Sequence, residues 1–297
     1  MKNLKLAAVC LSCLTMTGCS ALNFSVEGLI NAPKLTSEQS EIHQALIESV
    51  GSNITLKYPK NGEYRSAYVI ANIDDEPTDE AMVFYEYTSN GSEEDGLRVN
   101  ILDKDEDGKW YYVKELAGAG TDIDQVIISP MGSNNQTDVF VGYQNLTNDE
   151  KTMEIYSYTD GDFKRVALDT YSVLEPLDIN NDGYIELITI QRSTNNDTGA
   201  VTAKASMLNM KNNEITRGEN VDMCDNVTSY VSSKTGMLDS GRRAIFIDGL
   251  TADGKLQTEI IYYRYSGLQN PMQLRSEKLL PLCTRPAGYY SEDMDGD

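Results

Sequence analysis

From residue 54 onward, short apolar runs alternate with turns rich in Asp, Asn and Gly. The runs contain many β-branched and aromatic residues, and 18 tyrosines are spread along the chain. Runs of this length and composition, bounded by turn-forming residues, are typical of β-strands. Almost no helical periodicity interrupts them. The pattern therefore predicts an all-β fold for most of the chain.

The runs also repeat. Four segments, residues 72–85, 130–143, 178–190 and 235–247, each combine an acidic or glycine-containing turn with a following apolar strand. The strand openings at Glu80, Asp138, Glu186 and Arg243 are spaced by 58, 48 and 57 residues. A unit of this length can hold four short strands. Sheets of four strands repeated along a chain predict a β-propeller, in which neighbouring blades protect the strand edges.

Each unit is expected to end in a hairpin. The predicted strand pairs are 96–102 with 109–116, 153–158 with 163–168, 200–209 with 214–218, and 256–265 with 272–280. Their turns contain Asp-Gly or Asn-Asn pairs, which tolerate the backbone conformations of tight turns. The acidic turn over residues 103–110 is therefore interpreted as a solvated hairpin and not as a metal site.

One helix is predicted, over residues 36–51. Thr36 or Ser37 can cap its N-terminus, and the apolar residues Ile42, Ala45, Leu46 and Val50 share one face. The single histidine, His43, lies on this helix. Because no second histidine exists to share chemistry with it, His43 is interpreted as structural.

The segment 178–186 has the spacing of a calcium loop. Side-chain oxygens occur at every second position and a glycine, Gly183, follows the third. An EF-hand would need a glutamate at the twelfth position, where this chain has Thr189, and strands flank the loop on both sides. The predicted ligands of a structural Ca²⁺ are the side chains of Asp178, Asn180, Asp182 and Glu186 and the carbonyl of Tyr184.

This loop and its following strand resemble the calcium-binding repeat of FG-GAP and VCBS proteins, the propeller type of integrin α-subunit heads. The resemblance covers about residues 54–297 and implies the same five calcium ligands. The first repeat has Asn72, Asp74, Glu76 and Glu80 at matching places, with Pro77 instead of the glycine. The second and fourth repeats have Pro130 and Thr235 at the first ligand position and are interpreted as turns without metal. Residues 36–66 resemble the opening of uncharacterised lipoproteins from gut Firmicutes.

The N-terminus has the pattern of a lipoprotein signal peptide. Two lysines precede an apolar run over residues 6–14, and Met16-Thr17-Gly18-Cys19 resembles a lipobox. Lipidation of Cys19 would anchor the protein to the extracytoplasmic face of a bacterial membrane. The predicted organisation is a signal peptide (1–18), a tether (19–35), a helix (36–51) and propeller blades (52–297).

The formal net charge of −21 argues against nucleic acid as a partner, because phosphate binding requires a basic patch. Removal of residues 1–18 takes away Lys2 and Lys5 and leaves 23 basic against 46 acidic residues. Cys224 and Cys283 then remain beside Cys19. They lie at nearly equivalent places in neighbouring repeats, so two separate thiols are favoured over a disulfide.

Asp293, Asp295 and Asp297 repeat the first three ligand positions of the calcium loop. The chain ends before the glycine and the following strand. We therefore expect about four complete blades plus the start of a fifth, an incomplete ring that belongs to a longer protein.

Motifs for common enzymes are not found: the mature sequence has no Gly-x-Ser-x-Gly, no His-Glu-x-x-His, no phosphate loop and no Cys-x-x-Cys. The favoured interpretation is a protein without enzymatic activity, a lipid-anchored propeller that binds a protein or a glycan and is stabilised by calcium. The alternative is a carbohydrate-active enzyme, a polysaccharide lyase or hydrolase. Binding predicts clusters of aromatic and polar residues in loops, whereas catalysis predicts a deep pocket near the propeller axis with perturbed carboxylates.

Overall fold

The structure is a computed structural model that describes residues 35–88, 96–130, 137–145, 150–195, 197–211, 214–225, 227–238, 240–252, 254–270 and 284–285. The chain divides into two compact units, Met1–His43 and Gln44–Asp297. The helix crosses from one unit to the other, and all of the described strands belong to the second unit.

The predicted helix is present as α3, Ser37–Val50. Thr36 caps it, because its hydroxyl accepts a hydrogen bond from the Gln39 N–H (3.1 Å) and the Gln39 side chain accepts one from the Thr36 N–H (3.1 Å). This reciprocal pair is a capping box with glutamine as its second member. Ile42 and Leu46, four residues apart, are fully buried.

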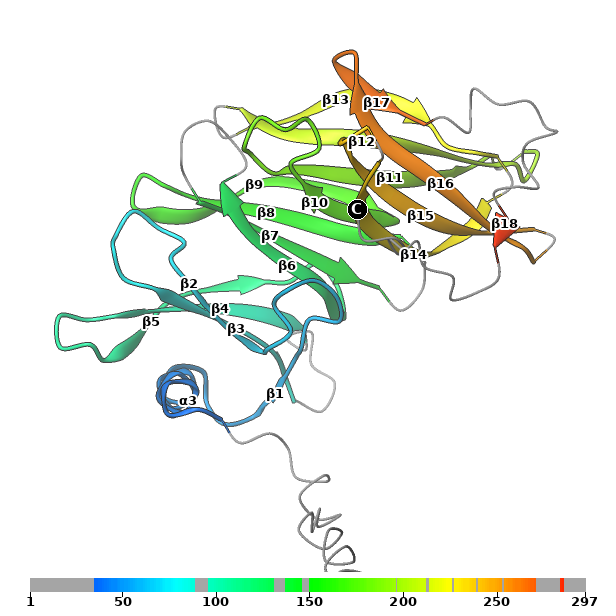
Figure 1. Cartoon of the computed structure of the whole chain (residues 1–297). Helices are drawn as coiled ribbons and strands as arrows, with labels where there is room; N and C mark the ends of the chain where they lie inside the picture. The colour runs from blue at the N-terminus through cyan, green and yellow to red at the C-terminus, as the bar shows by residue number, and fades with distance from the viewer. Residues whose placement is uncertain are drawn as a thin grey trace, which may run out of the picture. The chain divides into compact units, whose positions relative to one another are not determined.

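The described strands form four antiparallel sheets, which we call the first to fourth blades (Figure 1). The first blade contains β1 (Ile54–Leu56), β2 (Tyr68–Ala71), β3 (Glu80–Tyr87), β4 (Leu97–Lys104) and β5 (Trp110–Ala117). The second contains β6 (Asp122–Pro130), β7 (Thr137–Gln144), β8 (Lys151–Thr159) and β9 (Asp162–Tyr171). The third contains β10 (Val173–Leu177), β11 (Glu186–Thr194), β12 (Val201–Lys211) and β13 (Glu214–Asp222). The fourth contains β14 (Val227–Met237), β15 (Arg243–Thr251), β16 (Leu256–Arg264), β17 (Gly267–Gln269) and β18 (Thr284–Arg285).

The internal repeat predicted from the sequence is confirmed. Glu80, Glu186 and Arg243 are the first residues of β3, β11 and β15, and Asp138 is the second residue of β7. The predicted terminal hairpins of the first three blades are also present, as β4–β5, β8–β9 and β12–β13. In the fourth blade the predicted strand 272–280 lies outside the described residues, and β16 instead pairs with the short β17 and β18.

Apolar side chains between successive blades form the core. Val139 and Val141 of β7 belong to a cluster with the first blade, whereas Phe140 between them belongs to a cluster with the third. Since successive side chains of a strand point to opposite faces, both faces of β7 are buried. A third cluster joins the third and fourth blades. Burial on both faces explains why β3, β7, β11 and β15 contain continuous apolar runs and do not alternate apolar with polar residues.

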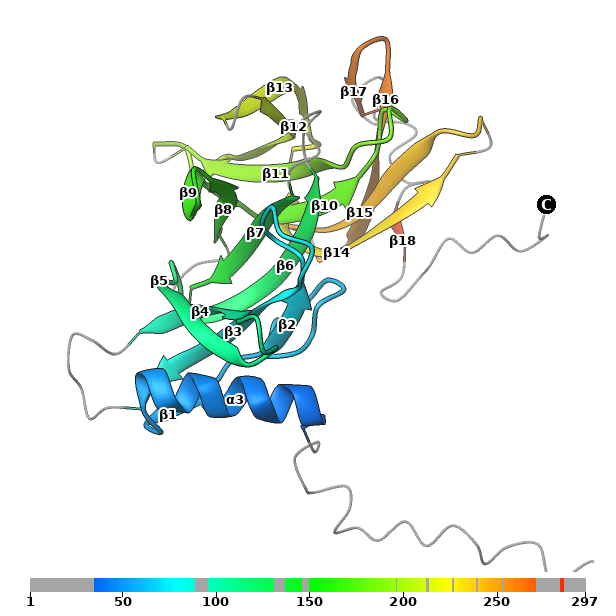
Figure 2. The same cartoon turned by 90° about the vertical axis from the view of Figure 1, so that its left-hand side faces the viewer.

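The fold is therefore all-β and propeller-like, as predicted. Figure 2 shows the four blades following one another from β2 to β16. Among the described residues, the core clusters join each blade only to its neighbours in sequence, so the ring is not closed.

Two departures from regular blades matter for the site. In the first blade the first strand is divided, because β1 and β2 pair with different parts of β3 and residues 57–67 leave the sheet between them. One β-bulge in β6 leaves Asp124 outside the pairing register with the neighbouring strand, and two in β14 leave Thr228 and Val231 outside it. A bulge redirects the side chain of the extra residue and is frequent beside functional sites.

Candidate functional site

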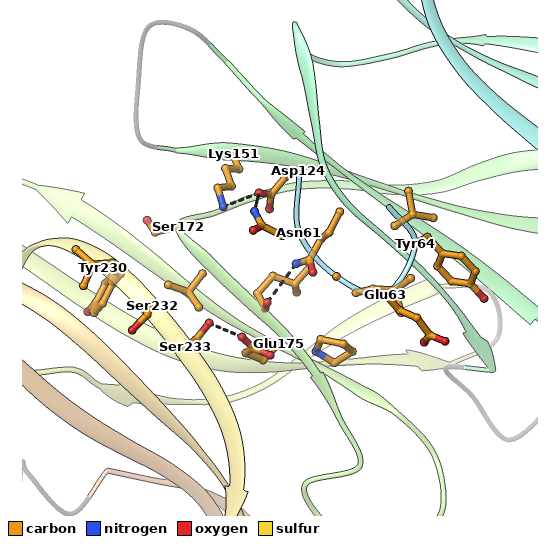
Figure 3. Close-up of a pocket in the computed structure, with 18 of the residues that line it drawn as sticks. Asn61, Glu63, Tyr64, Asp124, Lys151, Ser172, Glu175, Tyr230, Ser232 and Ser233 are labelled. Carbon is orange, nitrogen blue, oxygen red and sulfur yellow. Dashed lines mark hydrogen bonds and ion pairs between the residues drawn. The ribbon is translucent and has the colours of Figure 1, made fainter. Parts of the chain in front are cut away.

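A pocket of about 540 Å³ lies along the first strands of three blades (Figure 3). β6, β10 and β14 supply most of its lining, and residues 61–64 from the divided first strand of the first blade complete it. Two of the three bulged residues, Asp124 and Val231, line the pocket. The volume is within the range of small-molecule sites.

Segment 61–64 is held against β6 by backbone hydrogen bonds. The Lys60 N–H donates to the Ile123 carbonyl (3.1 Å), and the Asn61 N–H donates to the Asp124 carbonyl (2.7 Å). Gly62 has a φ of +80°, and a Cβ at this position would lie 3.2 Å from the Cβ of Gln125. Glycine is therefore needed here both for the backbone conformation and for the close approach to β6.

Asp124 is the centre of a buried polar network. Its side chain is only 2% exposed. It accepts hydrogen bonds from the Asn61 amide (2.8 Å), the Lys151 ammonium (2.8 Å) and the Tyr171 hydroxyl (2.6 Å). Burial, followed by the charge of Asp124, raises the pKa of Tyr171 well above its usual value, so this hydroxyl stays protonated and donates. The network joins the segment 61–64 to the second blade and fixes one wall of the pocket.

Glu175 of β10 is the carboxyl group at the opposite side of the pocket. The Ser233 hydroxyl of β14 donates a hydrogen bond to it, and Figure 3 shows the two side chains pointing toward one another. Burial raises the pKa of Glu175, and the hydrogen bond from Ser233 opposes this rise. On the neighbouring wall the Gln125 amide donates to the Leu174 carbonyl (3.2 Å), which ties β6 to β10.

The lining combines polar and apolar groups. Glu63 is exposed at the rim, and Tyr64 lies beside it with a pKa raised by burial and by the Glu63 charge. The apolar part of the lining consists of Val126, Ile127, Ile128, Val173, Leu174, Pro176 and Val231. Among the described residues of the lining, Lys151 is the one basic side chain, and its ammonium is paired with Asp124. The pocket is therefore acidic and partly apolar.

The predicted calcium loop forms the β10–β11 turn, and the structure brings its side chains together. Asp178 accepts hydrogen bonds from the N–H groups of Asp182 (3.0 Å) and Gly183 (3.2 Å). Glu186 accepts one from the Ile179 N–H (3.1 Å). Tyr184 takes part through its N–H, which donates to Asp182 (2.9 Å). Asn181 and Gly183 have φ values of 68° and 95°, which explains the glycine of the motif.

Three carboxylates converge in this turn. Burial raises the pKa of Glu186 to about 7, and the charges of Asp182 and Asp178 contribute. The Asn180 amide nitrogen donates to both Asp182 (2.9 Å) and Glu186 (2.7 Å), so it occupies the space between them. Among the described residues, no three histidine, cysteine, aspartate or glutamate side chains are arranged as a metal cage. The residue types are those that bind calcium, and a site here would require Asn180 to turn its amide oxygen inward.

The first repeat shares one hydrogen bond with this turn, although its backbone lacks the positive φ values of Asn181 and Gly183. The Ile73 N–H donates to Glu80 (2.8 Å), as the Ile179 N–H donates to Glu186, and burial raises the pKa of Glu80 to about 7. In the fourth repeat Arg243 takes the place of the closing acid. Its guanidinium reaches back to the third blade, where it contacts the Asp178 carboxylate (3.1 Å) and carbonyl (3.0 Å).

Several predictions concern residues outside the described part of the chain. These are the lipidation of Cys19, the pairing of Cys283 and the repeated motif at Asp293, Asp295 and Asp297. Among the described residues, no helix has the length and apolar character needed to span a membrane.

Comparison with known proteins assigns no family. No family model matches the sequence, and no curated protein matches it. One solved structure that is similar is that of a protein from Bacteroides fragilis provisionally named 6-phosphogluconolactonase, with a TM-score of 0.33 and 10% identity. The similarity covers 73% of this chain and 65% of that protein, so the chain spans about two thirds of its length. The resemblance to FG-GAP and VCBS repeats stays a prediction.

The comparison corrects one expectation. From the missing motifs we expected a protein without enzymatic activity, and this is contradicted because the similar structure carries the name of an enzyme. Sequence motifs report only the catalytic arrangements that recur at fixed spacing, whereas carboxylates brought together by different blades leave no such pattern. At this low similarity the comparison assigns no fold, reaction or substrate to this chain.

The pocket residues were not predicted from the sequence. Asp124, Lys151 and Glu175 come from β6, β8 and β10, and no local motif connects them. One signal was present, since Asp124 lies close to the apolar run 126–128 of the same strand, and buried acidic residues need partners. The β10–β11 turn could be singled out because all of its predicted calcium ligands lie within nine residues.

Proposed function

We propose that this chain is a lipid-anchored protein of the extracytoplasmic face of a bacterial membrane that binds a protein segment or a glycan in the pocket between its blades. The observation that supports this most is the pocket itself, to which three blades and a displaced segment contribute. Each wall is fixed by buried hydrogen bonds, as binding sites require. Mass spectrometry of the N-terminal peptide tests the anchor, and an unmodified Cys19 would contradict it.

The binding proposal predicts that filling the pocket abolishes binding. Val231 lines the pocket on β14 and is 55% exposed, so Val231→Trp adds an indole there at little expected cost in stability. Glycan and peptide arrays probed with the purified protein should show ligands whose signal falls at least about tenfold in this variant. Met237→Trp is the matched control, because Met237 lies on the same strand, is 68% exposed and is outside the lining. Equal binding by both variants would place the ligand elsewhere.

A second candidate is cleavage of the bound glycan by a hydrolase or lyase. It is supported by Glu175, a pocket carboxyl whose pKa is raised by burial, as a general acid requires. Glycans that bind on the array should then be converted to shorter products, and Glu175→Gln should stop the conversion. Intact glycans after prolonged incubation with the wild type would exclude this candidate and leave the binding proposal in place.

Calcium is proposed as a structural ion in the β10–β11 turn, held by Asp178, Asn180, Asp182 and Glu186 with the Tyr184 carbonyl. The ion would offset the repulsion among the three carboxylates. Supporting this, the motif gathers hard oxygen donors at a turn that is otherwise closed by the Asn180 amide.

Asp182→Ala is expected to lower the melting temperature only when calcium is present. A ligand that binds the folded state stabilises it by about 2.7 kcal/mol at one hundred times its dissociation constant, and we expect a loss of about 5 to 10 °C. Differential scanning calorimetry in millimolar calcium and in chelator measures this. Asp107→Ala in the β4–β5 hairpin is the control, since Asp107 also precedes a turn glycine, Gly108. An equal loss in chelator would show that Asp182 only shapes the turn.

A further inference from the structure

The pocket contains two carboxyl groups without a cationic partner. Neither Glu63 nor Glu175 forms an ion pair with a described residue, and the hydrogen bond from Ser233 is the one that Glu175 receives there. The two groups come from different blades and both line the same cavity (Figure 3). Carboxylates in such a setting favour a ligand that brings positive charge and hydrogen-bond donors.

Lys151, the basic residue of the pocket, cannot supply the positive charge that would pair with Glu63 and Glu175. Lys151 lies 2.8 Å from Asp124, which is 2% exposed and also holds Asn61 and Tyr171. Moving the ammonium away would leave a buried carboxylate without its ion pair, which is costly. The charge presented to a ligand is therefore that of Glu63 and Glu175, and an anionic ligand would be repelled.

The walls indicate which kind of cation fits. Calcium requires six to eight oxygen ligands, and magnesium requires a nearly octahedral set. The lining instead combines the two glutamates with apolar side chains, among them Leu174, Pro176 and Val231. A cation with an aliphatic body can bury its chain against this surface and place its charged end at a carboxylate.

We propose that the pocket binds an aliphatic ammonium group, with Glu175 as the principal acceptor, Glu63 as a second acceptor at the rim, and the apolar lining in contact with the carbon chain. This deepens the proposed binding function and rests on it. The same chemistry has two possible sources, a free diamine or polyamine and the lysine side chain of a peptide.

Isothermal titration calorimetry of the full chain in detergent tests the charge requirement with three ligands of equal length. Cadaverine is a dication, 1,5-pentanediol is neutral and glutarate is a dianion. Cadaverine should bind at least about tenfold more tightly than the diol, because a hydrogen bond to a charged group contributes more than a neutral one. Glutarate should not bind. Equal affinity for cadaverine and the diol would overturn the proposal.

Glu175→Gln should weaken cadaverine binding at least about tenfold and Glu63→Gln by a smaller factor. Glu106→Gln is the matched control, because Glu106 is an exposed carboxylate in the β4–β5 turn, outside the lining. Unchanged affinity in Glu175→Gln, or displacement of cadaverine by millimolar calcium, would overturn the proposal. A short peptide with one lysine, compared with the same peptide carrying norleucine, distinguishes the two sources.

The outcome also separates this inference from the binding function. If a neutral glycan binds in a manner blocked by Val231→Trp and cadaverine does not bind, the ammonium proposal fails while the binding function stands. If neither experiment gives binding that Val231→Trp blocks, both fail.

Discussion

Replacing Asp124 by alanine is expected to lower the free energy of unfolding by about 3 kcal/mol, because it leaves a partly buried ammonium and a buried hydroxyl without their acceptor. Asp124 accepts hydrogen bonds from Lys151, Tyr171 and Asn61. Tyr171 is fully buried and Lys151 is 24% exposed, so water replaces the lost acceptor only in part. Urea unfolding followed by circular dichroism measures the change.

The control for this prediction is a surface ion pair of similar length. Asp160 lies 3.1 Å from Lys164 at the β8–β9 turn, and its side chain is 83% exposed. Surface pairs contribute little, and the positive φ of Asp160 (55°) adds a small backbone cost for alanine, so Asp160→Ala should change the free energy of unfolding by less than about 1 kcal/mol. A loss in Asp124→Ala no larger than in Asp160→Ala would mean that the pocket network does not hold the blades together.

The fold was largely predictable because its information is local. Strand openings such as Glu80, Glu186 and Arg243 follow turns whose residue types favour particular backbone conformations. The repeats could therefore be aligned on these strand openings. The apolar runs were recognised because β3, β7 and β11 are buried on both faces. β6 and β14 were harder to recognise, since their bulges interrupt the alternation of apolar and polar residues.

The candidate site was predictable only where it lies in one segment. The β10–β11 turn gathers Asp178, Asn180, Asp182 and Glu186 within nine residues, and the structure places them together. Arg243 was predicted only as a strand opening, because its contact with Asp178 crosses from one blade to the next. The pocket depends on contacts of the same kind, such as that between Glu175 and Ser233, 58 residues apart. Such pairings follow from how the blades pack and have no signature in the sequence.

Gly142→Ala is expected to destabilise the protein by about 2 kcal/mol, through the pocket network and not through the backbone. Gly142 pairs with Gln125 beside the β6 bulge, and an added Cβ would overlap the hydroxyl of Tyr171 and approach the Phe140 ring to 3.3 Å. Both rings are fully buried, so neither can move aside freely. Tyr171 would be displaced from Asp124, and the pocket wall would lose one of its three hydrogen bonds.

A double-mutant cycle separates this cause from a general cost of alanine in a strand. Tyr171→Phe removes the hydroxyl that the added methyl group would meet, and by itself should cost about 1 to 2 kcal/mol for the lost hydrogen bond to Asp124. If the overlap with the hydroxyl causes the destabilisation, the double variant should be more stable than the sum of the single changes predicts, by about 1 kcal/mol. Strict additivity of the two unfolding free energies would show that Gly142 and Tyr171 act independently. Coupling would instead show that Gly142 is required because the Tyr171 hydroxyl must reach across the sheet to Asp124 at the β6 bulge.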